Sequence, residues 1–306
     1  MSFRHILFPV DFSDRCYNAA PYVKSMAARF NAAVTVLNVV ETPPAWAAAA
    51  DGGYAMEFDL PRFKEEAEHR LAIFAAQAFP PEPAPEGARS AEINFEVEHG
   101  DPGTCIAELA QAWDVDLIMM PTHGRGVFRR ALLGSAAAKV LNDAHCAVWT
   151  GVHMENPVPA DRTGIRTLVC GVDLNGDEPG CNVDLLKYTA KLAADWDARV
   201  CLVHAVPGTD ARPDLYYDIP LENFLRDVAR EQINKLQAQA GTDFAVYLEV
   251  GAVASVMREA CHYHNADLAV IGRGVIGHFA GGIRTHAYGI MRESPCPVLS
   301  VWDRHE

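Results

Sequence analysis

The two halves of this chain carry the same segments in the same order. Residues 116–124, DLIMMPTHG, return as residues 267–274, DLAVIGRG, and the opening run 6–11, ILFPVD, returns as residues 167–173, TLVCGVD. Each half is long enough to bury a core of its own, so the repeat indicates a duplicated domain and not a short solenoid unit. We therefore expect two related domains in one chain.

The boundary between the two domains falls in a polar segment. At 306 residues the chain has the length of two domains, and residues 152–164 carry two prolines between the repeats. We expect the first domain at residues 1–152 and the second at residues 164–306.

Short apolar runs alternate with segments of helical spacing in both halves. Ile6–Val10 and Val34–Val40 are typical of strands buried on both faces of a parallel sheet. Between them, Tyr17–Phe30 carries apolar residues at helical spacing. This alternation predicts an α/β fold with right-handed crossovers. We expect two tandem doubly wound, Rossmann-like domains, each a five-stranded parallel sheet flanked by helices.

Composition narrows the class of partner and the compartment. The net charge of −14 disfavours nucleic acid and anionic membranes, because both repel an acidic surface. No run approaches about 18 consecutive apolar residues, so we expect no membrane span and a cytoplasmic protein. The eight cysteines are scattered without a Cys-x-x-Cys pair, which is typical of small buried hydrophobic residues in an intracellular chain.

A glycine-rich loop in the first half follows a predicted buried strand and precedes a predicted helix. Ligands bind at the carboxyl ends of strands in open α/β sheets, so this loop is a candidate binding site. Glycines have no side chain, so their backbone N–H groups can approach an anion closely, and arginines supply positive charge. The loop has glycines at 124, 126 and 134, arginines at 125, 129 and 130, and Ser135 at the start of the helix. We expect Ser135 to cap the helix that begins at Ala136, and His123 to contact a phosphate. Loops of this kind also occur without a ligand, and the glycine pattern alone favours neither alternative.

Asp11 directly follows the first predicted strand, Ile6–Val10. With this aspartate and the glycine-rich loop, both halves resemble universal stress protein domains over nearly the whole chain. The family's nucleotide-binding signature is a glycine, two residues, a second glycine, nine residues, then glycine followed by serine or threonine. Gly124 and Gly134-Ser135 match this signature, whereas Pro121 replaces the first glycine. Proline brings a ring and no N–H, so one corner of the expected phosphate site is altered.

The resemblance implies the adenine nucleotide alpha-hydrolase-like fold and a site for ATP or ADP, with Mg²⁺ as its companion. In nucleotide-binding members an aspartate after the first strand lies near the adenosine, and the backbone after the second strand holds adenine. The implied cofactor-binding residues are Pro9, Asp11, Val39, Val40, Pro121, His123, Gly124, Arg125, Gly126, Gly134, Ser135 and Ala136. From the residues alone, Asp11 also suits a turn or helix-entry carboxylate.

The second half departs further from the signature. Gly272 stands at the first glycine position, Val275 at the second, and Arg284-Thr285 where the first half has Gly134-Ser135. An arginine in place of glycine projects into the volume that a phosphate needs, so we expect a degenerate second site. The resemblance further implies that the last strands, 146–150 and 296–301, pair within the chain, and it leaves a homodimer open.

Histidines outside the loop point to no metal centre. His262 and His264 are two residues apart, so on a helix they point apart, and no second ligand pair lies nearby. His204 lies on a predicted buried strand and is interpreted as a hydrogen-bonded core residue. We therefore expect no catalytic residue, no metal ligand and at most weak ATP hydrolysis.

Three functions remain open at this point. The leading hypothesis is a stress-response protein whose first domain binds ATP or ADP and acts as a nucleotide-dependent regulatory or binding module. An alternative is a slow ATPase or an autophosphorylating switch, with Ser135 or Thr122 as acceptor. Another is a nucleotide-free interaction module, which Pro121 favours and the retained glycines oppose.

Overall fold

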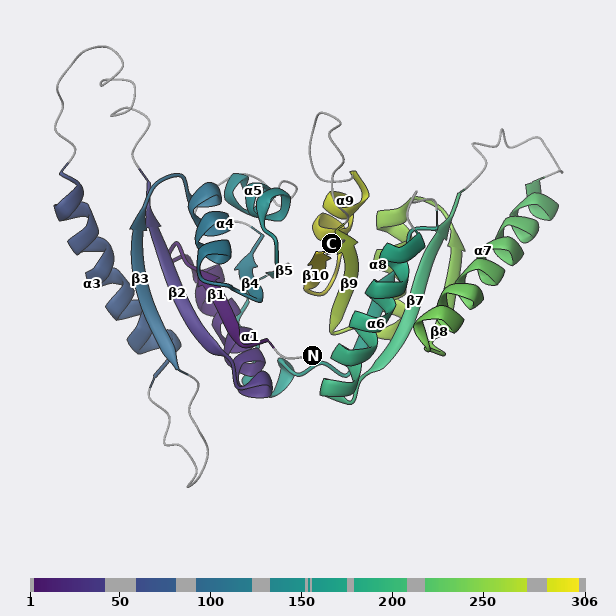
Figure 1. Ribbon diagram of the computed structural model, residues 1–306, viewed down its shortest axis with the longest axis horizontal. Coiled ribbons are helices and arrows are strands. Elements are labelled where there is room, and N and C mark those ends of the chain that lie inside the picture. The colour runs from purple at the N-terminus through teal and green to yellow at the C-terminus, as the bar shows by residue number, and fades with distance from the viewer. Residues whose placement is uncertain are drawn as a thin grey trace, which may run out of the picture. The chain divides into compact units, whose positions relative to one another are not determined.

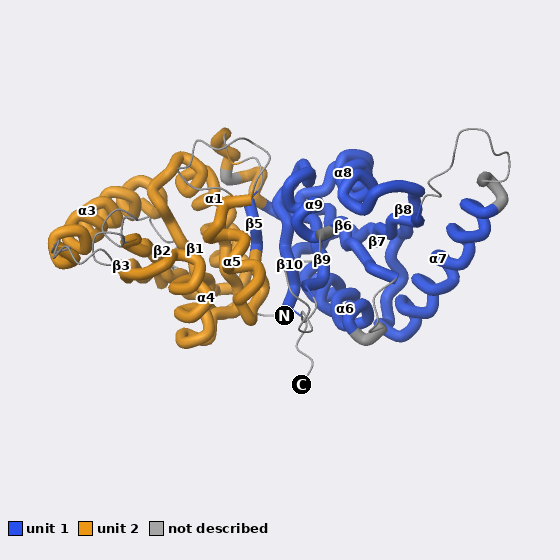
Figure 2. The backbone as a smooth tube through the Cα atoms, turned by 90° about the horizontal axis from the view of Figure 1, so that it is seen from above, with its two compact units in different colours: residues 1, 149–153, 164–306 blue, residues 2–148, 154–163 orange. Residues whose placement is uncertain are grey.

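The chain folds into two compact units, which Figure 2 draws in orange and blue. The computed structural model describes residues 3–41, 59–80, 92–122, 133–151, 154, 156–174, 179–207, 218–273 and 285–302. The N-terminal unit comprises Ser2–Val148 and Met154–Thr163, and the C-terminal unit comprises Trp149–His153 and Gly164–Glu306. The described helices include none that is both long enough and apolar enough to cross a membrane.

The N-terminal unit is a parallel sheet flanked by helices (Figure 1). Its strands lie in the order β3-β2-β1-β4-β5, and the pairings of β1 with β2 and β4, and of β2 with β3, are parallel. The elements are β1 His5–Pro9, α1 Asp14–Phe30, β2 Ala33–Val40, α3 Leu60–Ala78, β3 Ile93–His99, α4 Pro102–Ala112, β4 Leu117–Pro121, α5 Ser135–Asp143 and β5 Ala147–Gly151. The last three residues of β5 group with the C-terminal unit. Strand β4 is buried at every position, as an apolar strand covered by helices on both faces must be.

The C-terminal unit repeats this arrangement, with its strands in the order β8-β7-β6-β9-β10. Its elements are β6 Thr167–Gly171, α6 Pro179–Trp196, β7 Arg199–Val206, α7 Asp218–Ala240, β8 Ala245–Val250, α8 Val253–His264, β9 Leu268–Arg273, α9 Thr285–Glu293 and β10 Val298–Trp302. A short 3-10 helix, Ala160–Arg162, precedes them. The predicted fold class, two doubly wound α/β domains, is confirmed.

The duplication extends to the backbone conformation at helix ends. Asn31 after α1 and Asp197 after α6 both adopt left-handed conformations, with φ of 51° and 53°. The residues after α4 and α8 do the same, with φ of 52° at Asp114 and 49° at Asn265. A left-handed residue turns the chain out of a helix, and Asn and Asp tolerate that conformation better than most residues. The two units therefore leave α1 and α6, and likewise α4 and α8, through a left-handed residue.

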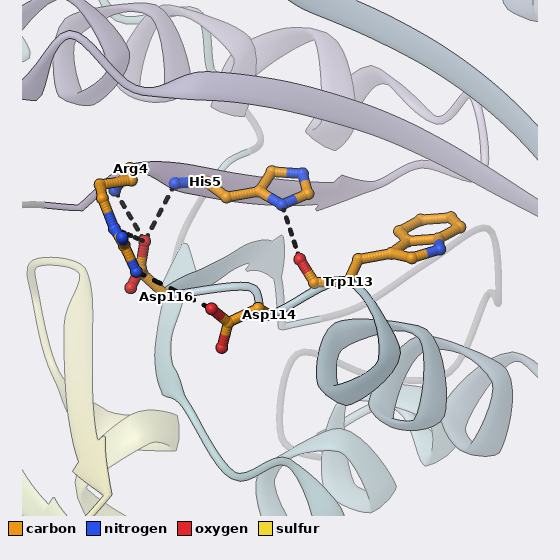
Figure 3. Close-up of polar contacts among 5 residues, drawn as sticks. All are labelled: Arg4, His5, Trp113, Asp114 and Asp116. Atoms are coloured by element: carbon orange, nitrogen blue, oxygen red, sulfur yellow. Dashed lines mark hydrogen bonds and ion pairs between the residues drawn. The ribbon is translucent and has the colours of Figure 1, made fainter.

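A carboxylate closes the amino edge of the first sheet, as Figure 3 shows. Asp116 precedes β4, and its Oδ2 accepts hydrogen bonds from the backbone N–H groups of Arg4 (2.7 Å) and His5 (3.1 Å). The His5 ring in turn contacts the Trp113 carbonyl through Nδ1 (3.2 Å) and the Thr35 hydroxyl through Nε2 (2.8 Å). This end of the sheet is thus built from side chains that hold backbone groups.

The C-terminal unit closes its amino edge in the same way. Asp267 precedes β9, and its Oδ2 accepts from the N–H groups of Arg166 (2.8 Å) and Thr167 (2.9 Å). Parallel strands have all their carboxyl ends at the opposite edge, so this repeated clamp lies away from the edge where ligands bind.

Candidate functional site

The candidate site lies at the carboxyl edge of the N-terminal sheet. Strands β1, β2 and β4 end there at Pro9, Val40 and Pro121, and they are neighbours in the sheet. Pro9 and Pro121 are buried, whereas Val39 and Val40 are half-buried. The Val40 carbonyl accepts a hydrogen bond from the Gly100 N–H (3.1 Å), which ties the end of β2 to the chain after β3. The fold thus brings these four predicted residues to one edge.

Asp11 shapes the turn between β1 and α1. Its Oδ1 accepts a hydrogen bond from the Ser13 N–H (3.0 Å) and another from the Cys16 thiol (3.1 Å). A carboxylate that accepts from the backbone N–H two residues later forms an Asx turn. The turn role that the sequence allowed for Asp11 is confirmed, and its contact with adenosine stays a prediction.

Phe12, in the same turn, has a strained backbone. Its φ of 62° lies in the left-handed region, which a bulky residue rarely adopts. The guanidinium of Arg70, on α3, lies over its ring with Cζ 4.4 Å from the centroid, and the Phe74 ring lies 6.1 Å away. Sequence reasoning missed this turn, because glycine or asparagine would have signalled a left-handed residue and phenylalanine does not.

The residue that follows β4 and the residue that precedes α5 are hydrogen-bonded to each other. The Gly134 N–H donates to the Thr122 carbonyl at 2.9 Å, so the two ends of the glycine-rich loop are joined by a backbone hydrogen bond. Gly134 occupies the N-cap of α5, and its carbonyl accepts from the Ala138 N–H (2.8 Å). This places the amino end of a nine-residue helix, with its first-turn N–H groups, at the carboxyl edge of the sheet.

Ser135 was predicted as the helix cap, and this was wrong. Ser135 is exposed and is the first residue of α5, because Gly134 is the N-cap and its carbonyl accepts the first helical hydrogen bond. The remaining loop predictions lie outside the described residues; these are His123, Gly124, Arg125, Gly126, Arg129 and Arg130. Of the predicted phosphate cradle, the structure therefore describes Pro121, Gly134, Ser135 and Ala136.

The two units support the end of their first strand with different side chains. In the N-terminal unit the Asn38 amide donates to the Val10 carbonyl at 2.7 Å. In the C-terminal unit His204 takes this place, with Nδ1 3.0 Å from the Val172 carbonyl oxygen. Burial lowers the pKa of His204 from its ordinary value, against the opposing effects of this bond and of Asp173. The interpretation of His204 as a hydrogen-bonded core residue is confirmed.

The carboxyl edge of the C-terminal unit carries a buried arginine. Arg273 ends β9 and stands as many residues after Asp267 as Thr122 stands after Asp116. Arg273 is 8% exposed, and its Cζ lies 5.2 Å from the centroid of the Trp302 ring. A guanidinium thus lies where the first unit has the threonine that starts its loop. Sequence reasoning assigned Arg273 no role, although it lies within the repeated segment 267–274.

Metal-ligating side chains do not gather in the described part of the chain. No group of three or more His, Cys, Asp or Glu residues there is placed to hold a metal ion. Of the histidine pair on α8, His262 is exposed, and His264 has Nε2 3.2 Å from the Cys201 sulfur.

Comparison with known proteins assigns a family. The model of the universal stress protein family matches residues 2–150 and again residues 164–301. A universal stress protein of Methanocaldococcus jannaschii is 32% identical over 146 residues, which cover 48% of this chain and 80% of that protein. One from Mycobacterium tuberculosis is 26% identical over 210 residues, covering 69% of this chain and 70% of that protein.

Solved structures agree in fold. The crystal structure of a universal stress protein from Archaeoglobus fulgidus superimposes with a TM-score of 0.65 at 18% identity, covering 98% of this chain and 97% of that chain. A putative universal stress protein from Pseudomonas aeruginosa gives a TM-score of 0.61 at 18% identity, covering 98% of this chain and 93% of that chain. At these identities the likeness shows the fold alone.

Proposed function

The chain belongs to the universal stress protein family, and we propose that its N-terminal unit binds ATP or ADP and acts as a nucleotide-dependent regulatory or binding module. The observation that carries this proposal is the junction of β4 and α5. There the Gly134–Thr122 hydrogen bond directs the amino end of α5 to the carboxyl edge of the sheet. First-turn N–H groups and the positive end of the helix dipole attract phosphate at such a position.

Neighbouring strands supply the rest of the proposed site. Strand β1 pairs with both β2 and β4, so the turn that contains Asp11 starts between the ends of those two strands. A carboxylate there suits a ribose hydroxyl, and the backbone of the half-buried residues Val39 and Val40 suits the edge of a base. Mg²⁺ would arrive on the phosphates, because it is commonly held by substrate phosphates with one or two carboxylates rather than by a protein cage.

The C-terminal unit serves, in this proposal, as a partner domain without a nucleotide of its own. The buried guanidinium of Arg273 changes the edge where the first unit has Thr122. Residues Trp149–His153, from the end of β5, group with the C-terminal unit, and there the Thr150 hydroxyl donates to the Val298 carbonyl (3.1 Å). This supports the proposal that the last strands of the two repeats pair within one chain.

We place this function in the cytoplasm. The eight cysteines form no disulfide in the described structure, and six of them are buried. Thiols kept as buried hydrophobic residues fit a reducing compartment.

A nucleotide-free interaction module is the second candidate, and Pro121 is the observation that favours it. This proline ends β4, is buried, and replaces the first glycine of the nucleotide-binding signature. It offers no N–H to a phosphate at the point where the loop begins.

A negative charge introduced at the start of α5 distinguishes the nucleotide-binding module from the nucleotide-free module. Ser135→Glu places a negative charge at the first helical residue, where it stabilises the helix by about 0.3–1 kcal/mol and repels a bound phosphate. We expect ligand-stripped Ser135→Glu protein to melt at the same or a higher temperature than wild type, but to lose the increase in Tm that ATP with Mg²⁺ produces. At a ligand concentration of about 100 times Kd, that increase corresponds to about 2.7 kcal/mol.

The matched control is Thr285→Glu, at the first residue of α9 in the other unit. This variant should keep the full ATP-dependent increase in Tm. Absence of any increase in stripped wild-type protein would favour the nucleotide-free module. Release of ADP by wild-type protein would favour the slow ATPase instead.

A further inference from the structure

The turn after the first strand is built differently in the two units, although α1 and α6, and likewise α4 and α8, are both followed by a left-handed residue. Phe12 adopts a φ of 62°. Its counterpart Leu174, which follows Asp173, is not among the described residues that have a positive φ. Strain in a single turn persists only where surrounding contacts enforce it, and such strain gathers at functional sites. In this turn the enforcing contacts are the guanidinium of Arg70 and the ring of Phe74.

Cys16 is a second difference between the two turns. It lies in the first part of α1, is 2% exposed, and donates its thiol proton to Asp11 Oδ1 at 3.1 Å. The Ser13 hydroxyl donates to the Cys16 sulfur at 3.7 Å, while the Ser13 N–H donates to the same carboxylate oxygen. Two donors therefore fix the position of one oxygen of Asp11.

The thiol keeps its proton at neutral pH. Burial, and then the negative charge of Asp11, raises the pKa of Cys16 to about 12. A thiol that stays protonated remains a hydrogen-bond donor through the physiological range. Cys16 is thus a permanent donor to Asp11 and not a nucleophile.

The C-terminal unit places a different residue at the equivalent helix position. Asn182 stands as far before Trp196, the last residue of α6, as Cys16 stands before Phe30, the last residue of α1. Its side-chain amide donates to the Asp173 carbonyl at 2.7 Å, and its Oδ1 accepts from the Asp173 N–H at 3.4 Å. Asn182 therefore holds the backbone of its aspartate, whereas Cys16 holds the carboxylate.

We propose that Cys16 is a positioning residue of the nucleotide site, which acts by holding the Asp11 carboxylate in the orientation that receives the ribose hydroxyls. The strained backbone at Phe12 sets the direction of the turn, and the Cys16 thiol fixes the side chain within it. This inference rests on the proposed nucleotide binding of the N-terminal unit. It identifies a difference between the two sites that lies outside the glycine-rich loop.

The test is calorimetric titration of the stripped full chain with ATP and Mg²⁺. Cys16→Ala removes the donor, and we expect affinity to fall on the order of fivefold, the value of about one hydrogen bond. Cys16→Ser keeps a donor at the same place and should bind within about twofold of wild type. In an Asp11→Ala background the further change Cys16→Ala should have no effect, because the thiol acts through Asp11.

Each other outcome overturns the proposal. Equal affinities of Cys16→Ala and wild type would show that the thiol is not needed, and equal losses in Cys16→Ala and Cys16→Ser would assign its role to packing. If Cys16→Ala fails to fold, Cys16→Val replaces it, since valine keeps the volume without a donor. Failure of wild type itself to bind would overturn the proposed function, and this inference with it.

Discussion

Asp116 and Asp267 hold equivalent pairs of backbone N–H groups in the two units, whereas the side chains at the opposite edge of each sheet differ. At that carboxyl edge Asn38 corresponds to His204, and Thr122 corresponds to the buried Arg273. The clamp at the amino edge is therefore the same in both units, whereas the carboxyl edge, where open α/β sheets bind ligands, differs. The proposed nucleotide site of the N-terminal unit lies at the edge where the two units differ.

The packing of two helices shows a different kind of divergence. In the N-terminal unit α4 has Gly103 against Lys139 of α5, where a Cβ on the glycine would lie 2.7 Å from the lysine Cβ. In the C-terminal unit the glycine is on the other helix: Gly289 of α9 faces Ala254 of α8, and an added Cβ would lie 3.2 Å from the alanine Cβ. Both units therefore keep a close helix contact, with the glycine on opposite sides.

The largest expected effect tests the shared clamp. Asp116→Ala and Asp267→Ala each leave two backbone N–H groups without their carboxylate, and we expect each to lower the free energy of unfolding by about 2–3 kcal/mol. Urea unfolding of the full chain measures both. A large loss in one variant and none in the other would break the equivalence of the two amino edges.

A smaller effect tests the exchanged helix contact. Gly103→Ala forces a Cβ against the rigid base of Lys139 and should cost about 1–2 kcal/mol, whereas Gly289→Ala should cost less, because its contact is looser. In a Lys139→Gly background, which resembles the other unit, Gly103→Ala should become neutral or stabilising. Urea unfolding measures these free energies. If Gly103→Ala lowers the free energy of unfolding equally in the Lys139→Gly background, the contact between the two helices is not the cause.

The smallest effect concerns pH. The folded-state pKa of His204 is lowered below its ordinary value of 6.5, so the unfolded chain takes up the proton more readily. Stability of the C-terminal unit should therefore be complete above the unfolded pKa and fall as pH drops below it. His204→Asn should remove this slope from unfolding curves recorded between about pH 5 and 7, and Asn38→His should introduce it in the N-terminal unit. If the pH dependence of stability persists in the His204→Asn variant, it arises from other titrating groups.

The sequence predicted the layers and failed at turns. Strand β1 was expected at Ile6–Val10 and is found at His5–Pro9. A run of apolar residues indicates that a strand is present, but it does not fix the residues at which the strand begins and ends. The start of α5 was missed by one residue, because Gly134 is its N-cap although serine is the residue type that usually takes that place.

The candidate site was predicted at the level of the turn and not of its contacts. Asp11 and the end of β4 follow from the repeat and from strand order, whereas no pattern marks a thiol as the partner of a carboxylate. A phenylalanine in the left-handed region contradicts its own preference and depends on Arg70, which lies far along the chain. Such features come from tertiary contacts, which local propensity does not encode.

The central claim is that the two units differ in nucleotide binding, and its most direct test is the stoichiometry of ATP with Mg²⁺ by isothermal titration calorimetry of stripped protein. The account predicts one site per chain, abolished by Gly134→Trp; the φ of −62° at Gly134 lets a tryptophan block the helix end without backbone strain. Two equivalent sites, or heat of binding that survives Gly134→Trp, would contradict it.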